Sequence, residues 1–245
     1  MKKILLTGAT GFIGSNILRE LSHRYKFFCL IRSKKKIKKK NVASINFRNF
    51  SELNNILNKN KFFAVLHCAT YYKKKHSHND VNKMIKANLV LGNKILENKN
   101  ILYCKKFINL TTTWENYNGV ENNPANLYSA YKLAFSNILK FYMKKLTNTK
   151  FYNIYLSDTF GGNDSRKKLF NTLKEDYKKR KTTILLSKNI KMNIINVKDI
   201  VSGIDALLIK NIKQGNYSIL NSSFTDVVKF LIYFNKHKKK KIKYK

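Results

Sequence analysis

The 245-residue sequence contains little of several residue types, and each scarcity excludes a class of protein. A single proline, Pro124, excludes proline-rich linkers and collagen-like repeats. Cys29, Cys68 and Cys104 are too few and too widely spaced for a disulfide framework, and each lies in or beside an apolar run. No apolar run approaches the ~20 residues that a membrane-spanning helix needs. We therefore expect a cytoplasmic protein with reduced thiols and no membrane partner.

Acidic residues are also scarce, with 13 Asp and Glu against 50 Lys and Arg, which gives a formal net charge of +37. Nucleic-acid-binding proteins gather their basic residues in patches and favour arginine for phosphate and base contacts. Here only six of the 50 are arginine, and lysine is spread along the chain together with abundant Asn, Ile and Tyr. That joint bias is typical of an AT-rich coding sequence. We expect no specific nucleic-acid partner, although the positive field favours anionic substrates.

Apolar residues make up 43% of the chain, which is enough for a substantial core, and they alternate between short runs and amphipathic segments. The runs predict strands at 3–7, 27–31, 62–67, 106–110 and 151–156. The amphipathic segments predict helices at 12–21, 80–97 and 124–145. Strands that alternate with helices in this way predict an α/β fold, a doubly wound parallel sheet of the Rossmann type.

Beyond Thr159 the pattern changes, which predicts a second, smaller lobe. The remaining predicted elements are a helix at 165–180, strands near 182–186 and 193–197, a helix at 200–209 capped by Asp199, a strand at 216–220 and a helix at 225–235. We expect an NAD(P)-binding Rossmann domain at 1–158, with a return segment near 193–210. Residues 159–245 are expected to form a reduced C-terminal substrate-binding lobe with a lysine-rich tail.

Three of the nine glycines lie between the first strand and the first helix, in the segment Thr7-Gly8-Ala9-Thr10-Gly11-Phe12-Ile13-Gly14. Gly8 permits a tight turn, Gly11 lets the backbone approach a pyrophosphate, and Gly14 lets helix and sheet pack closely. The helix N-terminus presents N–H groups and a positive dipole end to an anion. The motif predicts a dinucleotide site whose cofactor-binding residues are Gly8, Thr10, Gly11, Phe12, Ile13 and Gly14.

The end of the second predicted strand bears on the choice of cofactor. An acidic residue there binds the ribose hydroxyls of NAD, whereas a basic one favours a 2′-phosphate. The sequence has Arg32 and Ser33 at this place and no carboxylate. We therefore expect NADP(H) to be favoured over NAD(H), with Arg32 and Ser33 at the phosphate. The alternative is that Arg32 is only a surface charge.

A Y-x-x-x-K pattern, Tyr128 to Lys132, lies on the helix predicted after the fourth strand. The i to i+4 spacing puts both side chains on one face, one turn apart. An ammonium close to a phenol lowers the pKa of the phenol, so Tyr128 is expected to act as a general acid or base.

The glycine spacing and the Tyr128–Lys132 pair resemble the extended short-chain dehydrogenase/reductase family, which includes the NAD-dependent epimerase/dehydratase family, over about residues 2–210. The resemblance implies that Thr112 is the catalytic hydroxyl beside Tyr128 and Lys132, with Thr111 and Thr113 as its possible replacements. It implies further cofactor-binding roles for Cys68, Ala69, Thr70, Asn88, Tyr128 and Lys132. It implies substrate-binding roles for Thr112, Thr113, Trp114 and Arg166, and it implies a homodimer. We predict no metal site.

The residues after Thr112 discriminate between reactions of this family. Its dehydratases place Asp-Glu there, whereas this chain has Thr113 and Trp114, which disfavours dehydration. The surrounding segments resemble nucleotide-sugar 4-ketoreductases of the abequose and paratose synthase type. The resemblance implies reduction of a 4-keto group of a nucleotide-linked deoxysugar in surface-polysaccharide biosynthesis. The alternatives are a nucleotide-sugar 4-epimerase with bound NAD, and a non-catalytic dinucleotide- or nucleic-acid-binding protein on the same fold.

Overall fold

The structure is a computed structural model that describes residues 1–31, 36–73, 75–162, 164, 166, 168–184 and 191–236. Its contacts divide the chain into two compact units. The first comprises Met1–Leu156 and Val201–Ser218, and the second comprises Ser157–Ile200 and Ile219–Lys245.

A seven-stranded sheet forms the centre of the first unit, in the order β10-β6-β5-β4-β1-β2-β3. Its strands are β1 (Lys3–Thr7), β2 (Lys26–Ile31), β3 (Val42–Asn46), β4 (Ala64–His67), β5 (Lys106–Thr112), β6 (Lys150–Leu156) and β10 (Gly215–Ile219). The pairs from β3 through β2, β1, β4 and β5 to β6 are all parallel. This confirms the predicted Rossmann-type α/β fold.

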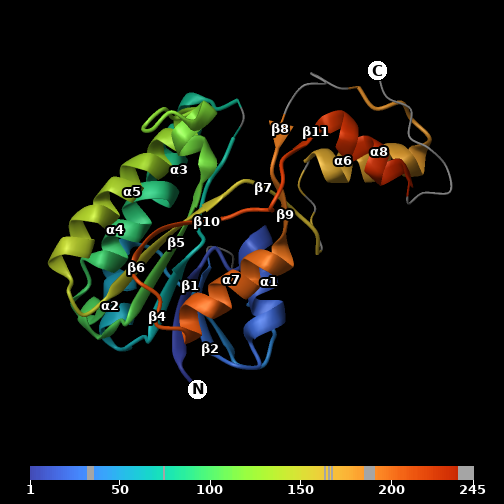
Figure 1. The fold of residues 1–245 in the computed structure, drawn as a ribbon. Coiled ribbons are helices and arrows are strands. Elements are labelled where there is room, and N and C mark those ends of the chain that lie inside the picture. The colour runs from blue at the N-terminus through green and yellow to red at the C-terminus, as the bar shows by residue number, and fades with distance from the viewer. Residues whose placement is uncertain are drawn as a thin grey trace. The chain divides into compact units, whose positions relative to one another are not determined.

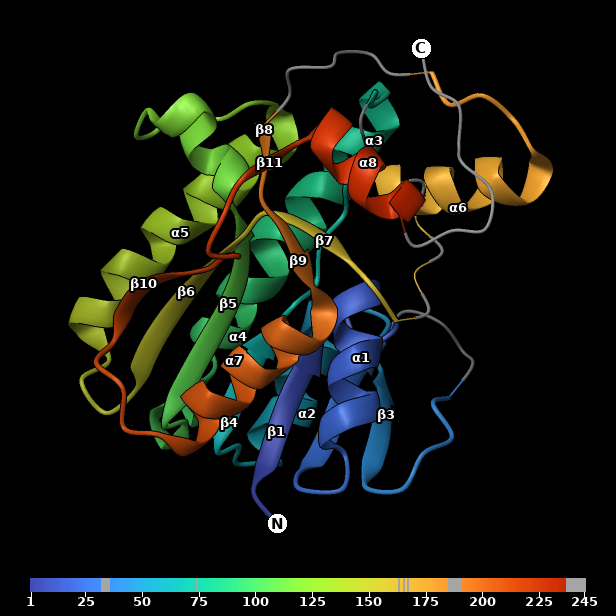
Figure 2. The ribbon, with the colours of Figure 1, turned by 45° about the vertical axis from the view of Figure 1, so that its right-hand side comes forward.

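Helices cover both faces of this sheet (Figures 1 and 2). They are α1 (Phe12–Leu21), α2 (Phe50–Asn58), α3 (His78–Ile85), α4 (Leu91–Leu96), α5 (Leu127–Lys145) and the C-terminal part of α7 (Val197–Ile209). The helices α2, α4 and α5 lie on one face, and α1 and α7 lie on the other. The central strands are apolar on both sides because both of their faces are covered. The core under α5 includes Leu5, Phe107, Phe135, Leu139 and Phe151.

Two elements of the first unit were not predicted. The strand β3 contains Ser44 and Asn46 and is only partly buried at the sheet edge, so it lacks the apolar run that marks the central strands. The helix α2 begins after Asn49, whose side chain accepts a hydrogen bond from the Glu52 N–H. Two further short helical turns are η2 (Lys99–Tyr103) and η3 (Thr113–Gly119).

The helix predicted at 165–180 begins later, at Leu169. Two other predicted helix starts were wrong because capping side chains decide them. The helix α5 begins at Leu127 rather than near Pro124, since Asn126 and Ser129 form a capping box. The helix α7 begins at Val197, so Asp199 lies in its first turn and is not its cap. The Asn196 side chain takes the capping role by accepting a hydrogen bond from the Lys198 N–H at 3.0 Å.

The second unit has a small core of its own, formed by Leu173, Met192, Val227, Leu231 and Phe234. Its elements are β7 (Asp158–Phe160), α6 (Leu169–Lys179), β8 (Lys191–Met192), β9 (Ile194–Asn196), β11 (Thr225–Asp226) and α8 (Val227–Lys236). Two two-stranded sheets, β7 with β9 and β8 with β11, belong to it. The strand predicted near 182–186 and the lysine-rich tail lie partly or wholly outside the described residues.

Candidate active site

The glycine turn joins β1 to α1 and leaves no room for side chains at two of its positions. Gly8 has a φ of +70°, and a Cβ there would lie 2.6 Å from the Cys68 backbone. A Cβ at Gly14 would lie 2.2 Å from the Gly8 carbonyl oxygen. Both glycines are therefore required for the close packing of this turn, as the sequence predicted for a tight turn and for helix–sheet contact.

The space over the N-terminus of α1 fits an anionic group. Gly11 is the N-cap residue of α1, and no side chain caps the helix there. A Cβ at Gly11 would meet only the Gly8 carbonyl oxygen, at 3.2 Å, so the exposed side of the turn is open. Phe12 and Ile13 are partly exposed in the first turn of α1. A helix N-terminus of this kind is suited to the pyrophosphate of a dinucleotide.

The end of β4 is tied to the end of β1 by the Thr7 hydroxyl. Thr7 Oγ1 accepts a hydrogen bond from the Ala69 N–H and lies 3.0 Å from His67 Nδ1. His67 is fully buried between Phe107 and Phe135, and burial, with a contribution from the Lys132 charge, lowers its pKa to about 3. The imidazole is therefore neutral at physiological pH and supports the backbone of the Cys68–Ala69 loop.

Asn88 fixes the next residues of this loop. Its side-chain oxygen accepts hydrogen bonds from the Thr70 hydroxyl at 2.7 Å and from the Tyr71 N–H at 3.2 Å, and its side-chain nitrogen donates to the Tyr71 carbonyl at 3.0 Å. Asn88 lies in a π-helical turn, η1 (Lys86–Val90), between α3 and α4, where the sequence predicted one continuous helix. Turns of this type are frequent at functional sites. The structure places Asn88 as a support of the loop.

Tyr128 and Lys132 lie one turn apart in the first half of α5. Tyr128 is hydrogen-bonded to Thr70, so the loop after β4 and the first turn of α5 meet at this phenol. Lys132 is 1% exposed, and its Nζ donates to the Leu110 carbonyl of β5 at 2.5 Å. Burial lowers the pKa of this ammonium to about 8, while Glu115 and Cys68 act in the opposite direction.

The prediction that the pKa of Tyr128 is lowered is wrong, because the pKa is raised in the structure. Burial raises the pKa of the phenol to about 12, with a further increase from the Glu115 charge, and the Thr70 hydrogen bond only partly opposes this. The physical reason is that the Lys132 ammonium is directed to the Leu110 carbonyl, and no effect of Lys132 on Tyr128 offsets the burial.

The three threonines at the end of β5 have different environments. The Thr111 hydroxyl is buried and donates to the Glu115 carboxylate. Thr112 is 9% exposed, and its hydroxyl accepts a hydrogen bond from the Trp114 N–H at 3.3 Å. Thr113 is partly exposed and begins η3. Because the Thr111 hydroxyl is engaged in the interior, Thr112 and Thr113 remain the candidates for contact with a substrate.

One aromatic side chain, Tyr72, lies beside the Tyr128 ring. Tyr72 approaches it edge-on with ring centroids 5.1 Å apart, and Trp114 lies 6.0 Å from Tyr72. Trp114 was predicted to contact the substrate, whereas Tyr72 was not, because nothing in its local sequence distinguishes it from the other 13 tyrosines. Glu115 was also missed, although it is one of only 13 acidic residues.

Arg166, predicted to bind a diphosphate, belongs to the second unit. Its guanidinium donates to both oxygens of the buried Asp164 carboxylate, at 2.8 Å each, and to the Thr159 carbonyl at 2.9 Å. Arg32 and Ser33 lie outside the described residues. Among the described residues, no three His, Cys, Asp or Glu side chains come together as a metal site, and no helix has the length and apolar character to cross a membrane.

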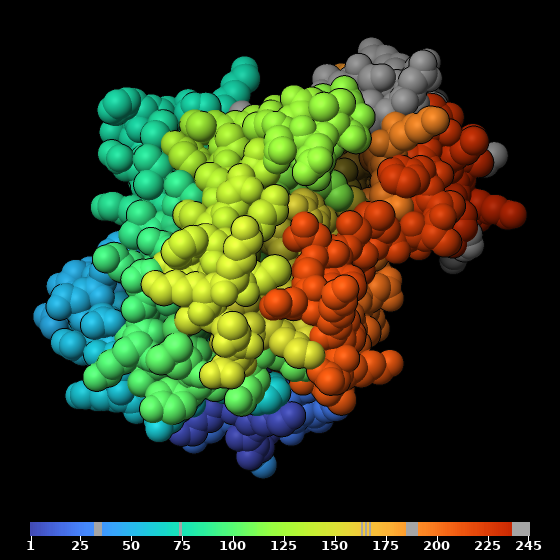
Figure 3. Space-filling model, turned by 60° about the vertical axis from the view of Figure 1, so that its left-hand side comes forward, coloured from blue at the N-terminus to red at the C-terminus, as the bar shows by residue number. Residues whose placement is uncertain are grey.

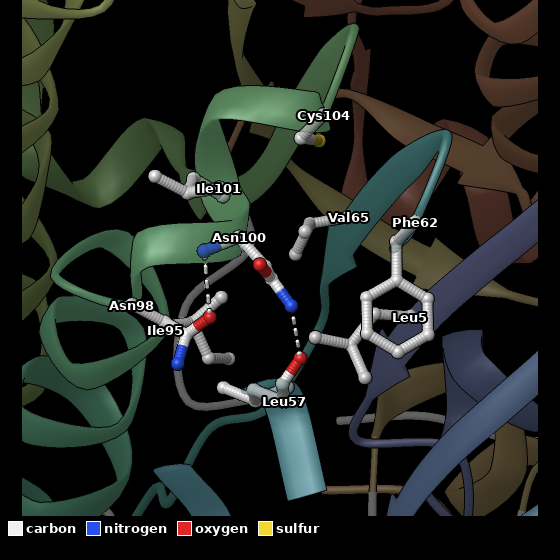
Figure 4. A pocket seen from close by; sticks show the side chains of 9 residues that line it. All are labelled: Leu5, Leu57, Phe62, Val65, Ile95, Asn98, Asn100, Ile101 and Cys104. Carbon is white, nitrogen blue, oxygen red and sulfur yellow. Dashed lines mark hydrogen bonds between the residues drawn. The ribbon is translucent and has the colours of Figure 1, made fainter. Parts of the chain in front are cut away.

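Among the cavities that the described residues line, two in the first unit bear on ligand binding. One, of about 10 Å³, is enclosed by Leu5, Leu57, Ile95, Asn100 and neighbouring side chains under the sheet (Figure 4). It holds one water molecule at most and is no ligand site. The other, of about 260 Å³, lies beside the glycine turn. Its lining residues are Ala9, Thr10, Ser15, Leu18, Arg19, Ile37 and Lys39.

Comparison with known proteins identifies the family to which the chain belongs. The family model for the "NAD dependent epimerase/dehydratase family" matches residues 4–221. The chain belongs to the NAD-dependent epimerase/dehydratase family. This confirms the resemblance drawn from the glycine turn and the Tyr128–Lys132 pair.

Individual members of the NAD-dependent epimerase/dehydratase family are only distantly similar. A CDP-abequose synthase from Salmonella muenchen is 24% identical over 221 residues, which are 89% of this chain and 74% of that protein. A dTDP-D-glucose 4,6-dehydratase from Dictyostelium discoideum is 27% identical over 273 residues, which cover 95% of this chain and 62% of that protein. The structure of a UDP-glucuronic acid 4-epimerase from Bacillus cereus, in complex with UDP-glucuronic acid and NAD, superposes with a TM-score of 0.84. It shares 16% sequence identity and covers 99% of this chain and 85% of its own.

Proposed function

We propose that this protein is an NAD(P)-dependent oxidoreductase of nucleotide-linked sugars that reduces a 4-keto group of a deoxysugar in surface-polysaccharide biosynthesis. The observation that carries the proposal is that Tyr128, one turn from Lys132, meets the loop after β4 that packs against the glycine turn. Thr112 ends β5, the strand next to β4 in the sheet. The similarity to a CDP-abequose synthase supports the reaction and the class of substrate.

Thr112, Tyr128 and Lys132 have different roles in the proposed reduction. A bound nicotinamide dinucleotide supplies the hydride. Thr112 donates a hydrogen bond to the reacting oxygen of the sugar, and Tyr128 gives its hydroxyl proton to that oxygen as negative charge develops on it. Lys132, one turn along α5 from Tyr128, holds the ribose of the cofactor. The buried environment strengthens each of these interactions.

NADP(H) is proposed over NAD(H) because the end of β2 has Arg32 and no carboxylate. The 260 Å³ cavity beside the glycine turn is lined by two further cations, Lys39 and Arg19, the latter also paired with Glu20, which suit a 2′-phosphate. Titration of the purified protein with NADPH and NADH tests the preference. Tighter binding of NADH would contradict it.

The second candidate is a nucleotide-sugar 4-epimerase, favoured by the fold similarity to 4-epimerases crystallised with NAD. The same Tyr128, Lys132 and Thr112 would serve that reaction, for which a bound dinucleotide would both accept and return the hydride. The two reactions differ in cofactor turnover, because a reductase consumes the reduced dinucleotide and an epimerase does not.

Absorbance of reduced nicotinamide with a panel of nucleotide-linked 4-keto sugars therefore decides between them. Stoichiometric loss of NADPH with one sugar supports the reductase. A protein that is purified with tightly bound NAD and interconverts UDP-sugars without net oxidation supports the epimerase. Salt-dependent binding of nucleic acid without turnover of any sugar would favour a non-catalytic role.

A further inference from the structure

Glu115 is a buried carboxylate to which the proposed reaction gives no role. It lies in η3, three residues after Thr112, and its side chain is fully buried. Its Oε1 accepts hydrogen bonds from the Thr111 hydroxyl and from the Ser136 hydroxyl, the latter at 3.1 Å. The Tyr155 hydroxyl also donates a hydrogen bond to this carboxylate. A buried carboxylate is costly unless a nearby positive charge compensates it.

Lys132 is the buried cation of the same region. An ammonium has three N–H donors, and in the described part of the chain its acceptor is the Leu110 carbonyl. Burial lowers the pKa of Lys132, and Glu115 is the first of the groups that oppose this decrease. The two groups therefore compensate one another in an interior that penalises each of them alone.

The backbone explains why these two groups lie in the same region of the interior. Thr111 directly follows Leu110 in β5, and Ser136 lies one turn after Lys132 on the same side of α5. Glu115 is thus hydrogen-bonded to Thr111, which follows Leu110 in the chain, and to Ser136, which lies one helical turn after Lys132.

Asn153 of β6 and Asn109 of β5 fix the position of the Ser136 hydroxyl, which donates to Glu115. The Asn153 side chain donates to the Ser136 hydroxyl at 3.1 Å and accepts from the Asn109 side chain at 2.7 Å. The carboxylate of Glu115 therefore has a fixed place between β5 and α5.

We propose that Glu115 is a positioning residue of the active site, whose carboxylate is the counter-charge that keeps the Lys132 ammonium protonated and held against the Leu110 carbonyl. This rests on the proposed function in so far as that function gives Lys132 its role beside Tyr128. The other ionisable groups that interact with this pair are His67, Cys68, Tyr128 and Tyr155.

None of these four supplies a negative charge at neutral pH. Burial raises the pKa of Cys68, Tyr128 and Tyr155 to about 12 each, and it keeps His67 neutral. Burial also raises the pKa of Glu115, but hydrogen bonds from Thr111, Ser136 and Tyr155 and the charge of Lys132 oppose this increase. Glu115 is therefore the acidic group that interacts with Lys132 in the described structure. Its loss should lower the pH at which Lys132 gives up its proton.

The Lys132 titration measured by NMR on the full chain labelled with ¹³C at the lysine ε-carbon tests this directly. The Lys132 resonance is assigned by its absence in Lys132→Met. Glu115→Gln keeps the shape and one oxygen acceptor but removes the charge, so its Lys132 midpoint should fall by about one pH unit or more. Glu97→Gln is the matched control, because Glu97 accepts a hydrogen bond from Tyr142, further along α5. The control should leave the Lys132 midpoint unchanged.

An unchanged Lys132 midpoint in folded Glu115→Gln overturns the proposal, since a purely structural carboxylate would not affect this titration. If Glu115→Gln does not fold, Glu115→Asp moves the charge by one methylene and should lower the midpoint by a smaller amount. An unchanged midpoint in that variant overturns the proposal equally. The measurement needs neither cofactor nor sugar, so failure to find turnover would contradict the proposed function and leave this test intact.

Discussion

Tyr128 is the residue on which the proposed chemistry depends most directly. Its phenol meets Thr70 and Lys132 follows one turn later, so removal of the hydroxyl removes the proton donor with little effect on packing. Tyr128→Phe should reduce kcat about 100-fold or more, in line with the usual contribution of a general acid. Binding of the dinucleotide, followed by fluorescence, should change little. Retention of full activity in Tyr128→Phe would contradict the assigned role.

His67 gives a prediction about pH and stability. Its pKa is lowered to about 3 in the folded protein, against an ordinary 6.5, because the ring is buried. The unfolded chain therefore takes up a proton below pH 6.5 that the folded chain excludes, and stability is lost as the pH falls from about 6.5 toward 3. The slope for one proton is about 1.4 kcal/mol per pH unit.

Urea unfolding at pH 7.5 and pH 5 measures this effect. The free energy of unfolding should fall between the two conditions, and the fall should be smaller by about 1–2 kcal/mol in His67→Gln, which has no such proton to exclude. His23→Gln, at an exposed position, is the control and should keep the full difference. Equal pH dependence in wild type and His67→Gln would show that other groups cause it.

Within the glycine turn, Gly14 is needed for stability as well as for dinucleotide binding, whereas Gly11 is needed mainly for binding. A Cβ at Gly14 would meet backbone atoms at 2.2–2.8 Å, so α1 must move away from the turn in Gly14→Ala. We expect a loss of about 1–3 kcal/mol of stability in urea unfolding, together with a loss of dinucleotide binding. Gly11→Ala meets one atom at 3.2 Å and should stay folded while binding the dinucleotide more weakly. Equal stability losses in both variants would contradict this division.

The end of α7 depends on a lysine from the sheet. Lys106 Nζ donates to the carbonyls of Leu207, Leu208 and Lys210 at 2.5, 3.2 and 2.7 Å, which satisfies groups that the helix end leaves free. Lys106→Met should cost about 1–3 kcal/mol in urea unfolding. Lys105→Met, at an exposed neighbouring position, is the control and should change stability by less than about 0.5 kcal/mol. Similar losses in the two variants would contradict a capping role for Lys106.

The predicted homodimer is a property of the whole molecule. The outer side of α5 forms part of the molecular surface, as the space-filling view shows in yellow-green (Figure 3), and Phe141 in this helix is 58% exposed. If α5 pairs with its copy in a dimer, Phe141→Glu should convert the dimer to a monomer in light scattering, because the charge would be buried. Ile209→Glu, 54% exposed in α7, should leave the mass unchanged. A monomeric wild type would contradict the prediction.

The sequence by itself determined the elements whose signals are local. The apolar runs of β1, β2, β4 and β6 and the glycines at 8, 11 and 14 were sufficient for the Rossmann-type fold, since a buried parallel strand and a phosphate-binding turn have strong local patterns. The edge strand β3 was missed because its residues are half polar. Helix starts were displaced where the side chains of Asn126 and Asn196 decide them.

Only the tertiary structure decided which groups share one environment. The spacing of Tyr128 and Lys132 indicated a reactive pair, but the direction of the Lys132 ammonium toward Leu110 depends on how α5 packs against β5. Glu115 looked like an ordinary acidic residue until the fold buried it against Thr111 and Ser136. Burial and charge compensation are set by residues far apart in the chain, and local patterns therefore do not determine the pKa of a buried group.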